Sequence, residues 1–257
     1  MSEHTLPRVV ELDRVRSACK QCSLMRLCLP MHIGSSDLLI LDGIIQRRRP
    51  VRRGEHLFHA GDRFDAVYAV RSGALKTYTA TEDGQEQVTG FHLPGELVAM
   101  DAIGPGTHPT SAKALETTSV CEIPFSRLEE LANRIPDLQH HLFRLLSNEI
   151  HSDHEMLLTL GKMHAEGRLA GFLLSLSSRF RQRGYSATEF LLPMSRNDIG
   201  NYLGLAVETV SRLFTRFQEE GVLSADRKHI RLHDMDRLHE FAGRRGHDQT
   251  DACKSRE

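Results

Sequence analysis

The sequence predicts an α+β fold made of an antiparallel β-roll, a long helix and a C-terminal helix-turn-helix with a wing. Between about residues 50 and 124, glycines recur at short intervals and separate runs rich in β-forming side chains. Such regular turn spacing is typical of a compact barrel or sandwich. After Pro124 the apolar residues take a helical spacing instead, and two short helical stretches flank Gly204.

Composition and length are those of an ordinary globular protein. The chain has 257 residues, is 40% hydrophobic and 26% charged, and carries a formal net charge of -1, which predicts about two domains. Residues 1–18 lack the apolar core of a signal peptide, and no apolar run approaches the roughly 18 residues that a membrane span needs. We therefore expect a cytoplasmic protein with no membrane partner, in which cysteines serve as ligands or core residues rather than disulfides.

The order of these patterns divides the chain into five segments. Within the β-rich part, Asp83 and Gly84 form the strongest predicted hairpin turn, because both tolerate positive φ. We expect a cysteine-rich arm over residues 1–29, a β-roll domain over 30–135, a long helix over 136–163, a winged helix-turn-helix domain over 164–240 and a disordered tail over 241–257.

The long helix is predicted to begin at Pro136, where proline suits the first helical position. Its apolar residues alternate three and four apart, which is the spacing of a coiled-coil seam and predicts a homodimer; the alternative is a helix packed on its own β-roll. Asp153 lies on the same seam, and two such carboxylates facing each other repel by up to about 4 kcal/mol at 4 Å. Asp153 is therefore predicted to oppose dimerisation, unless it points to solvent at the edge. The apolar seam positions are Phe143, Leu146, Ile150, Leu157 and Leu160.

The helix-turn-helix is predicted from its caps and turn. Ser195 can cap a helix over residues 196–203, Gly204 supplies the turn, and a second helix runs from Val207 to Phe217. The start of such a second helix enters the major groove of double-stranded DNA, where arginine can bind guanine and glutamate can accept from cytosine. A hairpin over residues 222–232, with Arg227, Lys228 and Arg231, is the expected wing. The outward residues of the second helix are Glu208, Thr209, Ser211, Arg212 and Arg216.

Three cysteines lie within ten residues of one another, at Cys19, Cys22 and Cys28. One loop with this spacing can provide three ligands of a metal centre, and Cys121 can provide the fourth, although a cysteine on a strand is often a small core residue. Four thiolates bind either zinc or an iron-sulfur cluster. We expect Arg14, Arg16, Lys20 and Arg26 to favour the thiolate form. Cys253 has no companion.

The stretch from Ser195 to Leu205, followed by Val207 to Leu213, resembles the recognition module of the Crp/Fnr superfamily, and is most similar to its fumarate and nitrate reduction (FNR) branch. The resemblance implies a cyclic-nucleotide-binding-like β-roll and a 4Fe-4S cluster on Cys19, Cys22, Cys28 and Cys121. It further implies a homodimer that binds a TTGAT-like inverted repeat through Glu208, Ser211 and Arg212 while oxygen is absent. The expected function is an oxygen-responsive activator of anaerobic-respiration genes that contacts RNA polymerase.

The resemblance also places polymerase contacts on the β-roll and leaves alternatives to test. A cyclic-nucleotide-responsive regulator is one, because Pro94-Gly95-Glu96 resembles part of that pocket, but the region of His108 to Ser111 lacks an arginine for a phosphate. We therefore expect no cyclic nucleotide. Nitric oxide is a second possible signal, and an enzyme is disfavoured because the chain has no dinucleotide fingerprint, P-loop or nucleophile elbow. The expected polymerase contacts are Ser72, Gly73, Asp83, Gly84, Glu116 and Thr118.

Overall fold

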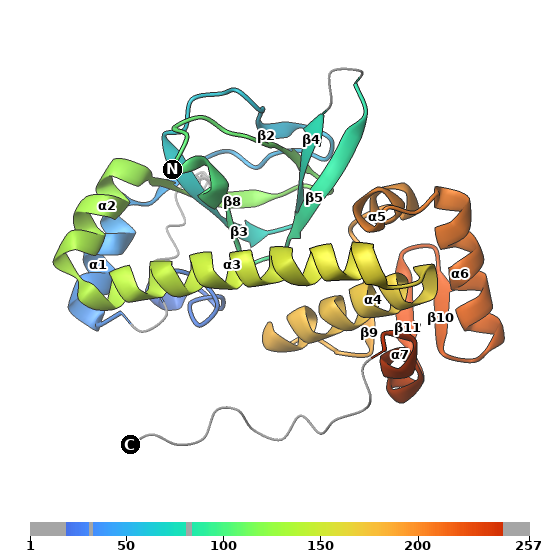
Figure 1. Ribbon diagram of the computed structural model, residues 1–257. Helices are drawn as coiled ribbons and strands as arrows, with labels where there is room; N and C mark the ends of the chain where they lie inside the picture. The colour runs from blue at the N-terminus through green and yellow to red at the C-terminus, as the bar shows by residue number, and fades with distance from the viewer. Residues whose placement is uncertain (1–18, 31–32, 81–83, 244–257) are drawn as a thin grey trace, which may run out of the picture.

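The structure is a computed structural model that describes residues 19–30, 33–80 and 84–243. Within them a β-roll domain lies along one side of a long helix, and a helix-turn-helix domain lies at that helix's C-terminal end (Figure 1). The predicted arm before Cys19, the turn residue Asp83 and most of the predicted tail fall outside these ranges. The helices are α1 (Ser35–Ile44), α2 (Phe125–Arg134), α3 (Pro136–Lys162), α4 (Ala165–Gln182), α5 (Arg196–Leu203), α6 (Val207–Glu219) and α7 (Met235–Phe241), with short 3-10 turns at Cys19–Gln21 and Met100–Ala102.

The β-roll consists of two four-stranded antiparallel sheets, in the orders β1-β8-β3-β6 and β2-β7-β4-β5. Their facing side chains, among them Val67, Leu75 and Ile123, are buried and form one core with α1 and α2. This confirms the compact antiparallel β-structure that the glycine spacing predicts and the β-roll that the resemblance implies. The strands are β1 (Gln46–Arg47), β2 (His56–Phe58), β3 (Ala66–Ser72), β4 (Leu75–Ala80), β5 (Glu86–His92), β6 (Leu97–Val98), β7 (Ser111–Ala114) and β8 (Ser119–Pro124).

Gly73, in the tight turn between β3 and β4, shows why this position takes glycine. Its φ is +82°, and a Cβ atom there would lie 2.5 Å from the Thr118 hydroxyl and 2.6 Å from the Thr117 carbonyl oxygen. Thr118 itself is fully buried, and its hydroxyl accepts from the amide of Ala74 and donates to the Ala74 carbonyl. The two segments are therefore locked together across the roll.

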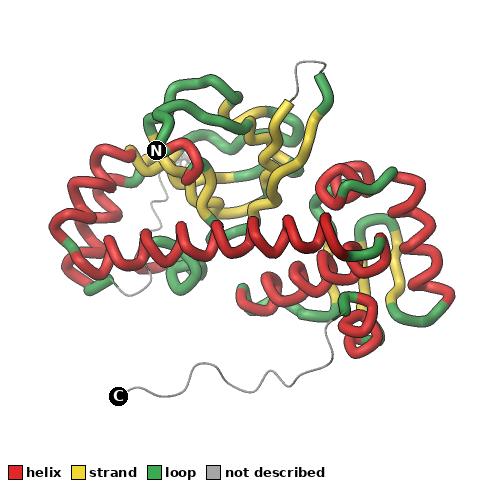
Figure 2. Tube along the Cα trace, in the orientation of Figure 1, coloured by secondary structure: helices red, strands yellow, loops and turns green. Residues whose placement is uncertain are grey.

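Helix α3 has 27 residues, so it is about 40 Å long, and it spans the molecule (Figures 1 and 2). Pro136 occupies its first turn, as predicted. Its N-terminal third packs on α2 through Leu138, which is buried. None of the helices in the described ranges combines the length and apolar character needed to cross a membrane.

The helix-turn-helix has the ends that the sequence predicts. The Ser195 hydroxyl accepts from the Asp198 amide while the Asp198 carboxylate accepts from the Ser195 amide, which is a capping box at the start of α5. Gly204 ends α5 in the left-handed conformation, with φ +62°. Behind α5 and α6 lie a buried core and a three-stranded sheet in the order β10-β11-β9, formed by Leu223–Asp226, His229–Leu232 and Glu189–Leu191. The wing hairpin is thus confirmed.

The core of the helix-turn-helix domain continues onto the β-roll. Val88 and Phe91 of β5 belong to the same buried cluster as Phe172 of α4 and Val210 of α6. Figure 2 shows α5 beside the β4 and β5 hairpin. The two domains therefore share apolar packing as well as a connecting helix.

Gly200 of α5 packs closely against the turn between α5 and α6, and this close contact gives a stability prediction. A Cβ atom on Gly200 would lie 2.6 Å from the Leu205 carbonyl oxygen, so Gly200→Ala should lower the free energy of unfolding by about 2 kcal/mol. A Cβ atom on Gly171, inside α4, would meet no neighbouring atom within 4 Å, so Gly171→Ala should raise it by up to about 1 kcal/mol through helix propensity. Urea unfolding followed by circular dichroism measures both, and a Gly200→Ala protein as stable as the parent would contradict this packing.

Candidate functional site

Helix α6 presents a polar face that the other described residues leave largely uncovered. Glu208, Arg212 and Arg216 are exposed, and Thr209 and Ser211 are half-buried. The opposite side of the helix is anchored by Val210, Leu213 and Phe214, which are buried. This arrangement has the form of a recognition helix whose first turns reach base edges in the major groove.

The two arginines of this face differ in how they are held. The Arg212 Nε atom lies 3.4 Å from the Glu208 carbonyl oxygen, and no carboxylate pairs with Arg212 within the described residues. Arg216 instead pairs with Glu166 of α4 and, at 2.7 Å, with Glu220. Arg212 can therefore contact a base without breaking an ion pair, whereas Arg216 must break its ion pairs with Glu166 and Glu220 before it can bind DNA.

The basic residues of the wing are also unequal. The Lys228 ammonium donates to the Pro193 carbonyl at 3.0 Å, and Arg231 pairs with Glu189 at 3.0 Å. Arg227 is exposed at the tip of the hairpin and has a φ of +53°. The tip is thus the part of the wing best placed to meet a phosphate.

Helix α3 carries an apolar stripe that the other described residues leave exposed. Phe143, Ile150 and Leu157 are seven residues apart and are 59%, 56% and 67% exposed. Leu146 and Leu160, on the neighbouring line of the helix, are half-buried. An exposed line of large apolar side chains at heptad spacing is a surface for a partner helix.

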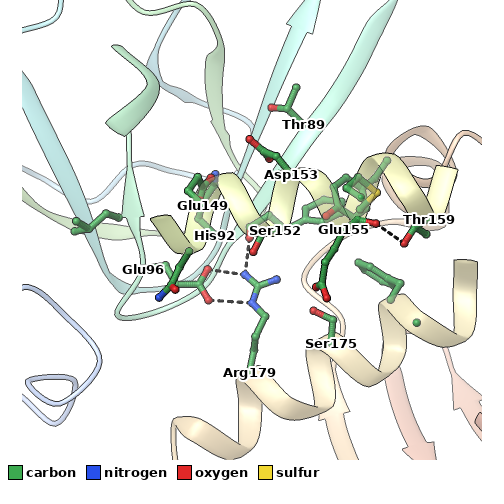
Figure 3. Close-up of a pocket in the computed structure, with 18 of the residues that line it drawn as sticks. Thr89, His92, Glu96, Glu149, Ser152, Asp153, Glu155, Thr159, Ser175 and Arg179 are labelled. Carbon is green, nitrogen blue, oxygen red and sulfur yellow. Dashed lines mark hydrogen bonds and ion pairs between the residues drawn. The ribbon is translucent and has the colours of Figure 1, made fainter. Parts of the chain in front are cut away.

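Asp153 is exposed and lies beside this stripe, at the rim of a cavity. Figure 3 shows it on α3 near Thr89 of β5. The cavity, of about 590 Å³, lies between β5, α3 and α4 and is also lined by Glu149, Glu96 and Arg179. Loss of water contact there, followed by the charge of Asp153, raises the pKa of Glu149. Whether Asp153 governs dimerisation stays a prediction.

The cysteines lie on the β-roll domain. Cys19, Cys22 and Cys28 belong to the segment before α1, and Cys121 is on β8, opposite Arg47 of β1 and Ala69 of β3. All four are free and partly exposed. In their ionised forms, Cys28 and Cys121 would raise the pKa of Cys19, and Cys22 would raise the pKa of Cys28 and of Cys121. The fold thus brings four residues from two distant parts of the sequence into electrostatic range of one another.

The protonation of these thiols is set by burial rather than by cations. Burial, and then a hydrogen bond to Asp42 of α1, raises the pKa of Cys19 to about 12, and burial raises the pKa of Cys28 to about 12. Burial also raises the pKa of Cys121, although Arg71 and Arg47 oppose it. The main causes of these pKa shifts do not include Arg26, while Arg14, Arg16 and the side chain of Lys20 lie outside the described residues, so the expectation that nearby cations favour the thiolates stays a prediction.

The expected polymerase contacts differ in how exposed they are to solvent. Ser72, Gly84 and Glu116 are exposed, and Gly73 is half-buried. Thr118 is 0% exposed, so its side chain cannot touch a partner, and its assignment as a contact is wrong. The resemblance placed the contact at this position, but a β-bridge between Thr118 and Val51 and the approach of Gly73 bury the side chain. Asp83 lies outside the described residues.

Sequence reasoning missed several polar residues that join the parts of the molecule. Arg168 of α4 donates to the carbonyls of Leu160, Met163 and Leu203, at 2.7 to 3.0 Å. Glu96 pairs with Arg179 at 2.5 Å and with Arg183. In the sequence, only the Pro94-Gly95-Glu96 turn draws attention to any of these residues. It resembles part of a nucleotide pocket and gives no sign that Glu96 holds α4 on the β-roll.

Comparison with known proteins agrees with this geometry. A Crp-like helix-turn-helix domain matches residues 167–241, and a cyclic nucleotide-binding domain matches residues 48–134. The transcriptional activator protein Anr of Pseudomonas protegens is 56% identical over 225 residues, which cover 88% of this chain and 92% of that protein. The chain belongs to the Crp/Fnr family.

Other members of the Crp/Fnr family resemble the chain over similar lengths. The fumarate and nitrate reduction regulatory protein of Escherichia coli K12 is 52% identical over 225 residues, covering 88% of this chain and 90% of that protein. Among solved structures, FixK2 from Bradyrhizobium japonicum has a TM-score of 0.70 at 32% identity and covers 77% of this chain and 97% of its own. The predicted family and fold class are confirmed, and the protein is a DNA-binding transcription regulator rather than an enzyme.

The recognition face of α6 gives a specificity prediction. Arg212→Ala should weaken DNA binding by about 1 to 3 kcal/mol and relax the preference at a single base position in each half-site. Fluorescence anisotropy with a set of single-base operator variants measures this, and Arg237→Ala, on α7 of the same domain, is the control. An equal loss on every sequence would mark Arg212 as a phosphate contact instead.

Proposed function

We propose that this protein is an oxygen-responsive transcription activator that binds a TTGAT-like inverted repeat as a homodimer when a 4Fe-4S cluster is intact. The observation that carries the proposal is the proximity of Cys121 to the cysteine segment 19–28 on a regulator whose recognition helix is exposed. The genes of anaerobic respiration are the proposed targets, by resemblance to the FNR branch. Each part rests on a different set of residues.

The donor set fits an iron-sulfur cluster better than a single zinc ion. Four thiolates around one zinc lie roughly 3.8 Å apart, as a Zn–S bond of about 2.3 Å requires. In a 4Fe-4S cluster each thiolate binds a different iron, so the four sulfurs stand further apart. In the described ranges no three Cys, His, Asp or Glu side chains converge tightly enough for a single metal ion, while the four cysteines remain within electrostatic range. Structural zinc more often takes two C-x-x-C pairs, whereas this chain offers three neighbouring cysteines and one distant cysteine, which supports the cluster.

The high pKa values of the cysteines set conditions for assembly. With pKa values of about 12, Cys19 and Cys28 are neutral thiols at neutral pH, and each must lose its proton to become a ligand. The cluster, when bound, supplies positively charged iron that stabilises these thiolates. Arg47 and Arg71, which already lower the pKa of Cys121, would offset the negative charge of the assembled site.

Dimerisation through α3 is proposed because its stripe is exposed. Phe143, Ile150 and Leu157 face solvent in the single chain, and a second copy of α3 would bury them in knobs-into-holes packing. Asp153, with Leu160 beside it, would sit close to its own copy across the two-fold axis. Its repulsion makes association marginal until assembly of the cluster favours the dimer.

Activation of transcription requires a surface for RNA polymerase. Ser72, Gly73, Gly84 and Glu116 remain the proposed contacts, because Ser72 ends β3 and the other three lie in connections between the strands of the β-roll. Asp83 belongs to the same proposed surface. Binding there leaves the recognition helix free for DNA.

A cyclic nucleotide is not the proposed signal, although a cyclic nucleotide-binding domain matches residues 48–134. Glu96 is already paired with two arginines of the same chain. Thr110 donates to Asp101 at 3.1 Å, the Ser111 hydroxyl accepts from the Ala60 amide at 2.9 Å, and His108 stacks on Phe58 at 3.8 Å between ring centroids. These side chains serve the β-roll itself, which supports a signal other than a nucleotide; nitric oxide remains the alternative.

The cysteine assignment predicts which replacements abolish the cluster. Replacing Cys19, Cys22, Cys28 or Cys121 by Ser should remove iron and sulfide from anaerobically purified protein and abolish anaerobic activity, because one iron loses its ligand. Cys253→Ser is the matched control and should keep both. Metal and sulfide analysis with an absorbance spectrum before and after air exposure tests this. A fully loaded Cys121→Ser protein, or colourless wild-type protein that holds zinc, would contradict it.

The carboxylate beside the seam predicts a change of oligomeric state. Asp153→Ala removes a repulsion of up to about 4 kcal/mol, so the variant should be a dimer that binds DNA in air. Asp137→Ala, in the first turn of the same helix, is the control and should remain like the parent. Analytical ultracentrifugation after air exposure measures this, and an Asp153→Ala protein as monomeric as the parent would rule out the switch.

A further inference from the structure

The helix-turn-helix domain is held on the β-roll by one continuous segment, residues 86–96, which we call the docking strand. It comprises β5, at the edge of its sheet, and the turn that follows. Helix α5 lies against its first half and helix α4 against its second half. Each half uses a different kind of polar contact.

At the first half, Asn201 of α5 pairs with the open edge of β5. Its side-chain oxygen accepts from the Val88 amide at 2.5 Å, and its side-chain nitrogen donates to the Glu86 carbonyl at 2.5 Å. The Gln87 side chain donates in turn to the Asn201 carbonyl at 2.8 Å. Asn201 thus satisfies two backbone groups of an edge strand that would otherwise face solvent.

Beside this contact, Lys76 of β4 pairs with Asp198 of α5 at 2.8 Å and with Glu86 at 3.3 Å. The Lys76 side chain is only 11% exposed. Asp198 is also the carboxylate of the capping box that starts the helix-turn-helix. A charged side chain of the β-roll therefore fixes the first helix of the DNA-binding motif.

At the second half, Glu96 binds two arginines of α4 and its C-terminal turn. Arg179 donates to both carboxylate oxygens, at 2.9 and 2.5 Å, and also to the Phe91 carbonyl at 2.5 Å (Figure 3). Arg183, whose side chain is 3% exposed, donates to Glu96 and, at 2.7 Å, to the Pro94 carbonyl. Between the two halves, the rings of Phe91, Phe172 and Tyr202 pack at centroid distances of 5.1 to 5.9 Å.

These contacts have a geometrical consequence. Arg168 joins α4 to the end of α3 and to α5. With this one attachment to α3, the helix-turn-helix domain could still rotate relative to the β-roll. A second attachment along the docking strand removes that rotation. The recognition helix then has one position relative to the dimerisation helix.

We propose that Asn201 and Glu96 are positioning residues for DNA recognition, which hold the helix-turn-helix domain on the docking strand and so restrict the dimer to one half-site spacing. Neither residue lies on the recognition face. The proposal rests on dimeric binding to an inverted repeat, but it concerns the distance between half-sites rather than their sequence or the signal.

The test is a series of inverted repeats whose spacer is lengthened or shortened by one or two base pairs. Each base pair shifts the second half-site by about 3.4 Å and turns it by about 35°. A rigid dimer cannot engage both half-sites of a wrong spacer, so the wild-type protein should lose affinity by on the order of 100-fold. Asn201→Ala and Glu96→Gln should each lose about tenfold or less, because the freed domain can follow the displaced half-site.

Two matched controls lie on α2, away from the interface. Asn133→Ala and Glu130→Gln make the same chemical changes at exposed positions, and Glu130 also pairs with an arginine, Arg127, at 3.3 Å. Both should keep the wild-type spacing preference. Glu96→Asp, which retains the carboxylate, should recover part of it.

A second measurement does not depend on DNA. Hydrogen exchange of peptides covering residues 84–96 should speed up in Asn201→Ala, because the Val88 amide loses its acceptor. If exchange rises but the spacing preference stays sharp, or if binding to a single half-site falls as much as binding to the repeat, the positioning role is overturned. Wild-type protein that fails to bind the TTGAT repeat contradicts the proposed function instead, and the spacer series is then built on the repeat that the protein selects from random DNA.

Discussion

The packing of α4 and α5 against strand β5 is the contact on which the rest of the structure depends. It merges the core of the helix-turn-helix domain with one face of the β-roll through Val88, Phe91 and Phe172. Because close-packed interiors deform little, a movement of this strand relative to α3 must displace the helices that bind DNA. The recognition helix owes its orientation to this contact as much as to its own turn at Gly204.

The same contact brings the cysteine segment close to the DNA-binding domain. A Cβ atom on Gly95 would lie 3.0 Å from the Leu27 Cβ, and Leu27 precedes the proposed ligand Cys28. On the other side of Gly95, Glu96 binds Arg179 and Arg183. One turn of the β-roll therefore touches the proposed cluster site through one residue and the DNA-binding domain through the next. A rearrangement around Cys28 can therefore reach α4 through Leu27, Gly95 and Glu96.

The local elements were predictable because their signals lie within a few residues. Ser195 and Gly204 mark the ends of α5 through a capping box and a left-handed turn, and Pro136 marks the start of α3. The pairing of β4 with β5 follows from strands that adjoin in sequence. Thr118 shows the limit: the resemblance placed it on the surface, whereas the approach of Gly73 and the bridge to Val51 bury it.

By itself the sequence determined the fold class, the family, the helix ends and the residue types of the two proposed sites, because each depends on periodicity, caps or short motifs. Tertiary structure decided the surroundings of the individual side chains, that is, their burial and their charged partners. It buried Cys19 and placed Asp42 beside it, it paired Arg216 with Glu166, and it made Glu96 an anchor for α4 rather than a pocket residue. Burial and charge pairing join residues that are tens of positions apart, and no local pattern encodes that distance.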